Sequence, residues 1–348
     1  VQYKLPKLLQ EWLTTQKSIN RRWFKKQTAA EFLKAYAKYF SKQLTNDLKK
    51  RPVDVLFVSA SPQLIAYIET DIPVVYMTDA TFQQIQGYYP YFSNLADYNR
   101  RQGVNLDKRA FQKASHCMLA SDWNKNSAVI DYGIDASKIS VVPCGANLDI
   151  IPAIHQINLT ATGNCNLLFL GVEWDRKGGD IALETFRHLK QNSINPRLHI
   201  IGCVPPHDLS GEQGITVIPF LDKNKEEDFK QLHAIFLQTD FLLLPTRAEC
   251  AGVVFSEASA YGIPSIATDT GGVTTYIKNG INGYALPHSA KGDEYAARIQ
   301  SILDDPARLE DLKKSSRTFY EASLAWDIWG QRFLEIAEKC FQQKGQPK

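Results

Sequence analysis

The sequence contains no apolar run long enough to cross a bilayer. Its longest runs, residues 53–58 and 241–245, fall far short of the roughly 20 residues that a membrane-spanning helix needs. Its start does not resemble a signal peptide. These two absences argue against a membrane-spanning or exported chain and predict a soluble protein of the cytoplasm.

The six cysteines lack the spacing of a disulfide framework or a metal site. They show neither a Cys-x-x-Cys pair nor the Cys and His spacing of a zinc site. They lie at positions 117, 144, 165, 203, 250 and 340. This pattern fits a chain that folds in a reducing compartment.

No internal repeat or low-complexity tract interrupts the 348 residues, a length that favours two domains over one. From Lys50 onward, short β-branched or aliphatic runs alternate with helical patterns, as in parallel strands joined by crossover helices. The predicted strands are 53–59, 74–77, 116–120, 139–142, 167–170, 198–201, 216–218, 241–244, 265–267 and 283–286. We therefore predict an α/β fold with two Rossmann-like domains, residues 1–150 and 151–320, followed by a helical segment at 321–348.

The start of the first domain departs from this pattern. An open α/β domain normally begins with a strand and a glycine-rich turn, whereas residues 1–50 have helical patterns. We therefore expect the first strands of this domain to be missing from the sequence.

The same N-terminal region is basic. Residues 1–51 hold 13 Lys and Arg against 3 Asp and Glu, although the whole chain carries a net charge of only +3. A helical, basic stretch with Trp12, Trp23 and Phe24 fits contact with anionic lipid headgroups or an anionic acceptor, and a solvated helix face gives the same pattern. No nucleic-acid-binding motif accompanies the charge, which argues against a nucleic-acid partner.

Two glutamates follow the strand predicted at 241–244. Glu249 lies on the next loop and Glu257 about one turn into the following helix. Ligands of such sheets bind at the carboxyl ends of the strands, and a carboxylate accepts hydrogen bonds from vicinal hydroxyls such as a ribose diol. Chance alone can also place two glutamates on a helix. Backbone amides at the helix start would face a phosphate, and these belong to Ala251, Gly252 and Val253.

Two further strand ends carry residues suited to an anion. Gly271 and Gly272 follow one strand, and the segment 171–179 with Arg176, Lys177 and Gly178 follows another. Fixed cations stabilise the negative charge that develops on a diphosphate leaving group, and the chain contains no Asp-x-Asp pair. We therefore expect no metal and no cofactor at this site; the alternative is a pair of exposed loop cations.

Together these segments resemble family 4 of the retaining glycosyltransferases. The resemblance covers most of residues 50–335 and rests on five motifs: Glu249-x7-Glu257 with Gly252, 171–179 around Lys177, Gly262-x-Pro264, Gly271-Gly272 and Asn279-Gly280-x-Asn282-Gly283. It implies two Rossmann-like domains facing across a cleft, the type B architecture. Residues 1–150 would bind the acceptor and 151–320 the nucleotide-sugar donor, while the helix at 321–348 would cross back to the first domain.

The resemblance also implies roles for individual residues. In the family, the first glutamate contacts the donor sugar, the second the ribose, and an Arg and a Lys the diphosphate. These roles fall on Glu249, Glu257 and Lys177. The family often has its Arg just after the glycine equivalent to Gly171, where this chain has Val172. Arg176 is the candidate replacement.

Asp79 follows the strand predicted at 74–77, where many members of the family have a histidine. A carboxylate there could orient the donor sugar, stabilise charge at the anomeric carbon or bind an acceptor hydroxyl, although an Asp in a turn or helix cap is also common. Other candidates for the acceptor side or the cleft are Tyr88, Ser121, Asp122, Gly145 and Asn147. Core packing for Tyr88 and helix capping for Ser121 and Asp122 are the alternatives.

The sequence thus predicts a retaining glycosyltransferase of hexosyltransferase type. Its catalytic residues would be Asp79, Glu249 and Lys177, and its partners a nucleotide-sugar donor and a sugar or lipid-linked acceptor. We expect a bacterial cytoplasmic enzyme of polysaccharide or glycolipid biosynthesis, peripheral on the inner face of the membrane. The alternative is a non-catalytic nucleotide-sugar-binding or scaffold protein of the same fold.

Overall fold

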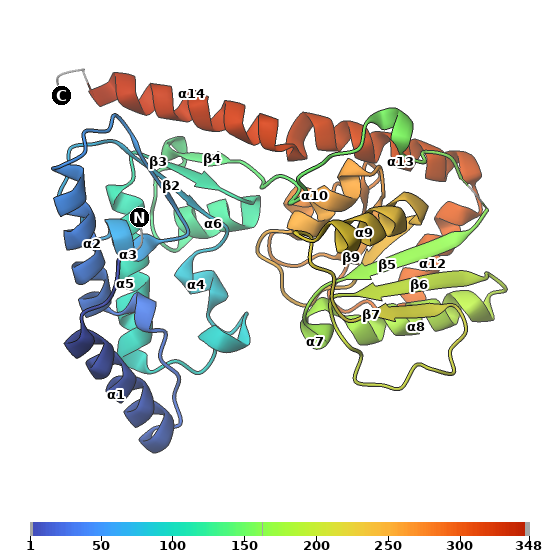
Figure 1. Ribbon diagram of the computed structural model, residues 1–348, viewed down its shortest axis with the longest axis horizontal. Helices are drawn as coiled ribbons and strands as arrows, with labels where there is room; N and C mark the ends of the chain where they lie inside the picture. Colours follow the sequence, from blue (N-terminus) through green and yellow to red (C-terminus); the bar gives the residue numbers. More distant parts are fainter. Residues whose placement is uncertain (1–2, 162, 345–348) are drawn as a thin grey trace. The chain divides into compact units, whose positions relative to one another are not determined.

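The computed structural model describes residues 3–161 and 163–344, which form two compact units (Figure 1). The first unit comprises the chain up to Val142 together with the part from Gln331 onward, and the second comprises Pro143–Gly330. The sequence predicted boundaries at 150 and 320. In the structure, the backbone N–H of Cys144 donates to Tyr276 Oη at 3.0 Å and the Cys144 carbonyl accepts from Ser256, which ties this segment to the second unit.

The first unit contains a four-stranded parallel sheet in the order β1-β2-β3-β4. Its strands are β1 Leu56–Ser59, β2 Val74–Thr78, β3 His116–Leu119 and β4 Ile139–Val141. Its α-helices are α1 Lys7–Trp23, α2 Lys34–Leu48, α3 Pro62–Ile65, α4 Phe82–Ile85, α5 Asp97–Lys113 and α6 Asp122–Ile130, and its 3₁₀ turns are Ala30–Phe32, Pro90–Phe92 and Ala136–Lys138. Helix α14, Trp326–Lys344, starts in the second unit and enters the first at Gln331.

Buried apolar residues hold this sheet to its helices. Strands β2 and β3 are almost fully buried, as expected for parallel strands covered on both faces. On α5, Leu106, Ala110 and Phe111 recur at helical spacing and are buried. The Phe111 ring lies 5.5 Å from the ring of Tyr76 in β2, which joins helix and sheet in one core.

The second unit contains a six-stranded parallel sheet in the order β10-β9-β8-β5-β6-β7. Its strands are β5 Cys165–Leu170, β6 Pro196–Ile201, β7 Ile215–Ile218, β8 Phe241–Leu244, β9 Ser265–Thr268 and β10 Gly283–Leu286. Its α-helices are α7 Trp174–Lys177, α8 Gly179–Gln191, α9 Glu226–Gln238, α10 Val253–Ala260, α11 Val273–Tyr276, α12 Gly292–Leu303 and α13 Pro306–Phe319; a 3₁₀ turn Ile154–Gln156 and a π-helical turn Tyr320–Leu324 complete it.

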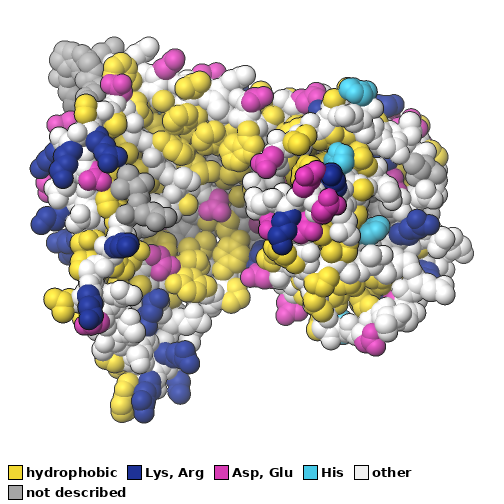
Figure 2. Space-filling view, in the orientation of Figure 1, with side chains coloured by type: hydrophobic (Ala, Val, Ile, Leu, Met, Phe, Trp, Pro, Cys, Tyr) yellow, Lys and Arg dark blue, Asp and Glu magenta, His cyan; other side chains and the backbone are white. Residues whose placement is uncertain are grey.

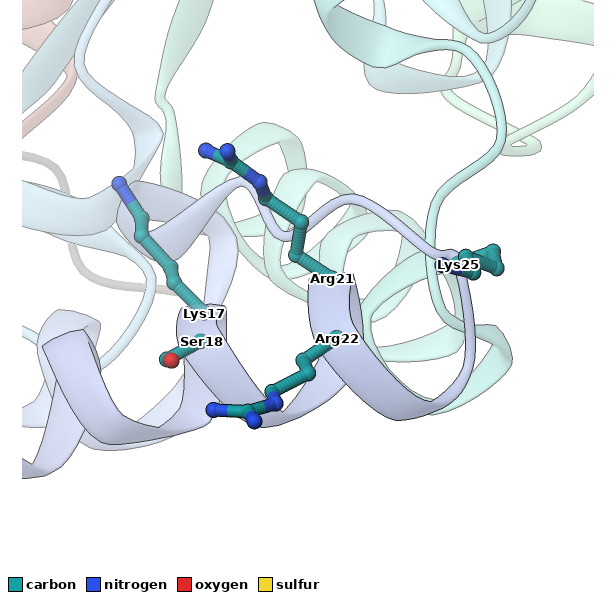
Figure 3. Close-up of a pocket in the computed structure, with 5 residues that line it drawn as sticks. All are labelled: Lys17, Ser18, Arg21, Arg22 and Lys25. Atoms are coloured by element: carbon teal, nitrogen blue, oxygen red, sulfur yellow. The ribbon is translucent and has the colours of Figure 1, made fainter.

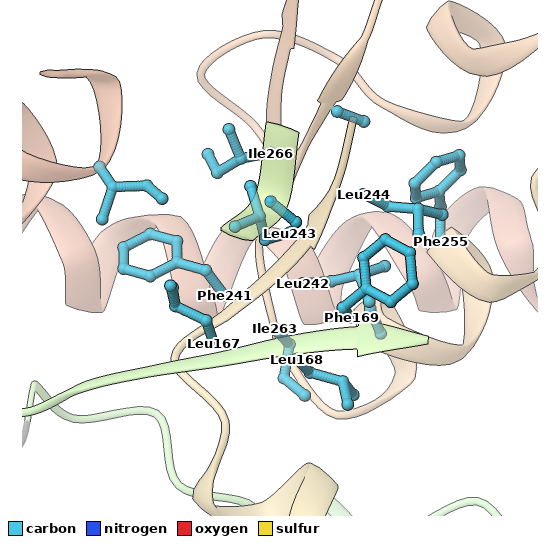
Figure 4. Packing of buried hydrophobic residues seen from close by; sticks show 14 of the residues in the cluster. Leu167, Leu168, Phe169, Phe241, Leu242, Leu243, Leu244, Phe255, Ile263 and Ile266 are labelled. Carbon is cyan, nitrogen blue, oxygen red and sulfur yellow. The ribbon is translucent and has the colours of Figure 1, made fainter. Parts of the chain in front are cut away.

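The strand order creates a switch point between β5 and β8. The chain builds the sheet outward from β5 to β7, returns to place β8 on the other side of β5, and continues outward to β10. Apart from Asn166, the central strands β5 and β8 consist of apolar residues, and their side chains pack with Phe255 of α10 (Figure 4). Loops after β5 and β8 therefore diverge and leave room for a ligand at the carboxyl edge.

The predicted α/β fold with two parallel sheets is confirmed, and each of the ten predicted strands overlaps a strand of the structure. The largest difference is at β1, predicted from residue 53 but beginning at Leu56. The segment 171–179 was predicted only to follow a strand, and within it Trp174–Lys177 forms one helical turn, α7. Among the described helices, none is both long and apolar enough to cross a membrane.

Candidate functional site

A pocket of about 640 Å³ lies at the carboxyl edge of the second sheet. Gly171 and Val172 after β5, Gly202 after β6 and residues 220–224 after β7 contribute to its lining. Helix α10, which follows β8, contributes Val253, Val254 and Glu257. The pocket therefore occupies the switch point between β5 and β8, where ligands of doubly wound sheets bind.

One end of the pocket, called here the cationic end, holds Lys177 and Arg176, which pair with the carboxylates of Glu249 and Glu173. Lys177 is only 9% exposed, and its ammonium forms an ion pair with Glu249. The Arg176 guanidinium donates to the carbonyl of Ala248 at 2.9 Å and lies 3.9 Å from Glu249 Oε2. The alternative of two exposed loop cations is therefore wrong: the turn of α7 packs both side chains against the loop that carries Glu249.

Glu257 is the buried carboxylate of the pocket. It is 3% exposed, and its Oε1 accepts a hydrogen bond from Lys223 Nζ at 2.6 Å. Burial raises the pKa of Glu257, while the charge of Lys223, its hydrogen bond, the backbone N–H of Asn147 and the charge of Lys177 oppose that rise. The ion pair thus favours the ionised form of Glu257, which can accept hydrogen bonds from a ligand in the pocket.

The rest of the lining is mainly apolar. The side chains of Leu170, Ile201, Phe220, Leu221 and Leu232 line it together with Val253 and Val254. The pocket thus combines an apolar surface, a buried carboxylate and two cations. Among the residues described, no group of three or more His, Cys, Asp or Glu side chains is placed to hold a metal ion.

The predicted glycines and amides shape the backbone around the pocket. Gly178 has φ +76°, and a Cβ there would lie 2.0 Å from the carbonyl oxygen of Pro245, so only glycine fits. Gly252 directly precedes α10, and no described side chain caps the start of this helix. The backbone N–H of Val253 donates to the carbonyl of Ala251. Gly271 turns the chain at φ +54°, and Gly272 N–H donates to the Glu249 carbonyl at 3.0 Å.

The residues predicted for the acceptor side or the cleft fall into two groups. Ser121, Asp122 and Tyr88 lie in the first unit. Ser121 caps α6 by accepting from Asn124 N–H at 3.1 Å, and Asp122 is the first residue of that helix. The ring of Tyr88 packs with that of Trp123. Gly145 makes room for the Trp326 ring in the second unit. Asn147 lines the pocket beside Glu257, on the side predicted for the donor.

Asp79 follows β2 directly, in a turn that buried contacts fix. Thr81 and Gln84 form a capping box at the start of α4, and Asp107 Oδ2 of α5 accepts from Phe82 N–H at 2.8 Å. Asp107 is buried, and its burial raises its pKa to about 7, against the opposing effect of the hydrogen bonds from Phe82 and Tyr132. Asp107 thus positions the turn that presents Asp79.

The raised pKa predicts a pH dependence of stability. Between about pH 4 and 7, folded Asp107 holds a proton that the unfolded chain has released, so its contribution to the free energy of unfolding falls as pH rises through this window. Asn cannot titrate, so the Asp107→Asn variant lacks this pH dependence. We therefore expect the melting temperature of wild type to fall relative to that of Asp107→Asn as pH rises through this window. Thermal melts from pH 4 to 8 measure it, and a difference that is constant with pH, or that grows in favour of wild type as pH rises, would contradict the assignment.

The sequence analysis missed Lys223 and Phe220. Both lie on the loop between β7 and α9, which carries no recognisable motif. Their position after the strand predicted at 216–218 is the only signal that could have found them, because it places the loop at the same edge of the sheet as Glu249 and Glu257.

The second unit matches a known family. Residues 151–319 match the model of the glycosyl transferases group 1. A D-inositol 3-phosphate glycosyltransferase of Gordonia bronchialis is 23% identical over 258 residues, which cover 68% of this chain and 55% of that protein. The chain spans about half the length of the curated relatives it matches, 53% and 55% for two of them.

Solved structures show the same fold. Sucrose-phosphate synthase of Thermosynechococcus elongatus superposes with a TM-score of 0.65 at 18% identity, covering 89% of this chain and 79% of that one. Alr3699/HepE of Anabaena, in complex with UDP and glucose, gives a TM-score of 0.62 at 17% identity, with coverage of 87% and 82%. The fold is thus the type B, two-Rossmann-domain fold of glycosyltransferases; assignment to family 4 stays a prediction.

Proposed function

We propose that this chain, whose residues 151–319 form a group 1 glycosyltransferase domain, transfers a sugar from a nucleoside diphosphate sugar to an acceptor hydroxyl. The observation that carries the proposal is the combination found in one pocket. An apolar surface suits a base, the buried Glu257 suits a ribose diol, and Arg176 and Lys177 suit a diphosphate.

In the proposed reaction, the diphosphate leaves with increasing negative charge. Lys177, Arg176 and the amides at the start of α10 stabilise that charge because they are already in place, so the reaction needs no metal ion. Glu249, which pairs with Lys177, binds hydroxyls of the donor sugar. Asp79, from the first unit, acts at the reacting sugar or the acceptor, and the sugar keeps its anomeric configuration.

The comparisons suggest which substrates to test first. The Anabaena structure holds UDP and glucose, and the Gordonia relative is named a D-inositol 3-phosphate glycosyltransferase. We propose a nucleotide hexose as donor, and UDP sugars are the first to test. The proposed acceptor is a sugar or lipid-linked intermediate in the synthesis of a bacterial polysaccharide or glycolipid. Reaction in the cytoplasm gives such an enzyme access to sugar nucleotides.

A turnover assay tests the proposal. The chain is incubated with UDP, GDP, ADP and CDP sugars and a panel of hydroxyl acceptors, with EDTA or with magnesium, and products are analysed by NMR for anomeric configuration. We expect transfer with retention that EDTA leaves unchanged. Binding of a sugar nucleotide without transfer or hydrolysis across the panel would favour the alternative, a non-catalytic binding or scaffold protein.

We further propose that α1 places the first unit on anionic membrane surfaces. One face of α1 packs on the unit through Leu13 and Asn20, whereas Leu8, Trp23 and Phe24 are 82%, 75% and 65% exposed. A second pocket of about 560 Å³ lies at the end of the helix, and Figure 3 shows its lining of Lys17, Ser18, Arg21, Arg22 and Lys25. Blue cationic and yellow apolar atoms lie together over this end in Figure 2, the combination that binds anionic lipid headgroups.

Vesicle sedimentation measures this contact. We expect the chain to bind vesicles of mixed phosphatidylglycerol and phosphatidylcholine at low salt and to release at high salt, with weak binding to phosphatidylcholine alone. Arg21→Glu with Arg22→Glu should weaken binding by at least about tenfold, because each basic residue contributes about 1 kcal/mol at such a surface. The control, Arg101→Glu with Lys108→Glu on α5, should bind like wild type; equal losses from both pairs would reject α1 as the contact.

A further inference from the structure

The loop between β7 and α9 presents Lys223 to the pocket on a defined turn. Asp222 Oδ1 accepts from the backbone N–H of Asn224 at 3.0 Å and from its side-chain amide at 2.9 Å. Asp222 N–H in turn donates to Asp228 Oδ2 of α9 at 2.9 Å. These contacts fix the backbone on both sides of Lys223, so its ammonium reaches Glu257 from a rigid support.

The hydrogen bonds of Glu257 leave part of its carboxylate available. An ionised carboxylate has about four acceptor sites on its two oxygens. Lys223 Nζ and the backbone N–H of Asn147 take two of them. About two sites remain for a ligand in the pocket, which is the number that two vicinal hydroxyls require.

We propose that Lys223 is the positioning residue that makes nucleotide binding depend on the ribose diol, because it holds Glu257 ionised and fixed with two acceptor sites directed to the ligand. This inference rests on the proposed function, since it assumes a nucleoside diphosphate in the pocket. A 2′-deoxyribose offers one hydroxyl instead of two and gains less from the carboxylate.

The surroundings of Glu257 make Lys223 the main support of its charge. Lys177 of α7 contributes a weaker electrostatic effect. Tyr261 directly follows α10; its burial, and then the charge of Glu257, raise the pKa of its phenol, and His233 Nδ1 of α9 lies 2.7 Å from Tyr261 Oη. Without Lys223, the desolvation of this buried group is opposed mainly by one amide and a more distant ammonium, so neutral Glu257 becomes more populated near neutral pH.

Calorimetric titration with UDP and with 2′-deoxy-UDP tests the inference. If wild type prefers another base, the corresponding pair of GDP, ADP or CDP and its 2′-deoxy form is used. Near pH 6.5, Lys223→Met should weaken binding of the ribonucleotide about tenfold, since one charge-assisted acceptor is impaired. The affinity of the variant for the 2′-deoxynucleotide should stay within about threefold of the wild-type affinity. The loss of ribonucleotide affinity should become smaller as pH is raised toward about 8.5, because a higher pH favours the ionised carboxylate. Lys223→Arg should keep the preference for ribose.

Controls separate this role from a structural one. Lys225→Met changes an exposed lysine of the same loop and should bind both nucleotides like wild type. Equal losses for both nucleotides in Lys223→Met, or ribonucleotide binding as tight as wild type near pH 6.5, would overturn the inference. Absence of nucleotide binding by wild type would instead reject the proposed function, and a melting temperature for each variant checks that it folds.

Discussion

Replacing Lys177 with Met should slow sugar transfer by about 100- to 1,000-fold. The side chain is buried, sits at the cationic end of the pocket and pairs with Glu249. Loss of one preorganised group that stabilises transition-state charge typically costs this much in rate. Steady-state turnover with the preferred donor measures the loss, and the dissociation constant of the nucleoside diphosphate shows how much of it arises already in the ground state.

Two variants accompany this measurement. Lys190→Met, at the exposed end of α8, should retain wild-type turnover. Asp79→Asn, in the first unit, should lower turnover while leaving nucleotide affinity unchanged, because Asp79 is proposed to act at the sugar rather than at the nucleotide. Turnover of Lys177→Met within about threefold of wild type would contradict the role assigned to the cationic end of the pocket.

Replacing Lys313 with Met should lower the free energy of unfolding by about 3–5 kcal/mol. Lys313 of α13 and Asp240, just before β8, are each 2% exposed, and Nζ lies 2.9 Å from Oδ1. The Asp240 carboxylate also accepts from Asn166 N–H of β5 at 3.0 Å. Without the ammonium, a carboxylate stays buried with no compensating charge at the junction of two central strands, and urea unfolding measures the cost.

The neighbouring residue provides the control. Lys314 is 55% exposed and pairs with Glu310 at 3.6 Å, so Lys314→Met should cost less than about 1 kcal/mol. Adding Asp240→Asn to Lys313→Met should restore most of the lost stability, because no charge then stays buried and the amide oxygen still accepts from Asn166. A single and a double variant of equal stability would show that charge burial is not the cause.

The fold was largely predictable because parallel buried strands are continuous apolar runs. The run at 241–244 predicts a strand, and β8 is indeed buried along its whole length. The one-turn helix α7 was not predictable, because Trp174–Lys177 has no helical periodicity and depends on tertiary contacts. The Trp174 ring packs beside Phe169, and the Arg176 carbonyl accepts from Arg247 N–H.

The candidate site was predictable where its residues lie in motifs after strands. Glu257, Arg176 and Lys177 were named from sequence and line one pocket. The ion pair of Lys223 with Glu257 could not be predicted, because it joins residues 34 positions apart through the packing of a loop without a motif. Asn147 was predicted for the acceptor side or the cleft, because its position near the expected domain boundary gave no sign of its contact with Glu257.

Calorimetric titration of the chain with UDP, GDP, ADP and CDP in the presence of EDTA tests the central claim most directly. The account predicts that at least one of them binds without metal and that Glu257→Ala weakens this binding by about tenfold or more, since the hydrogen bonds of a ribose diol to a charged acceptor are lost. No binding of any nucleoside diphosphate by wild type, or equal binding by wild type and Glu257→Ala, would contradict the assignment of this pocket to the donor.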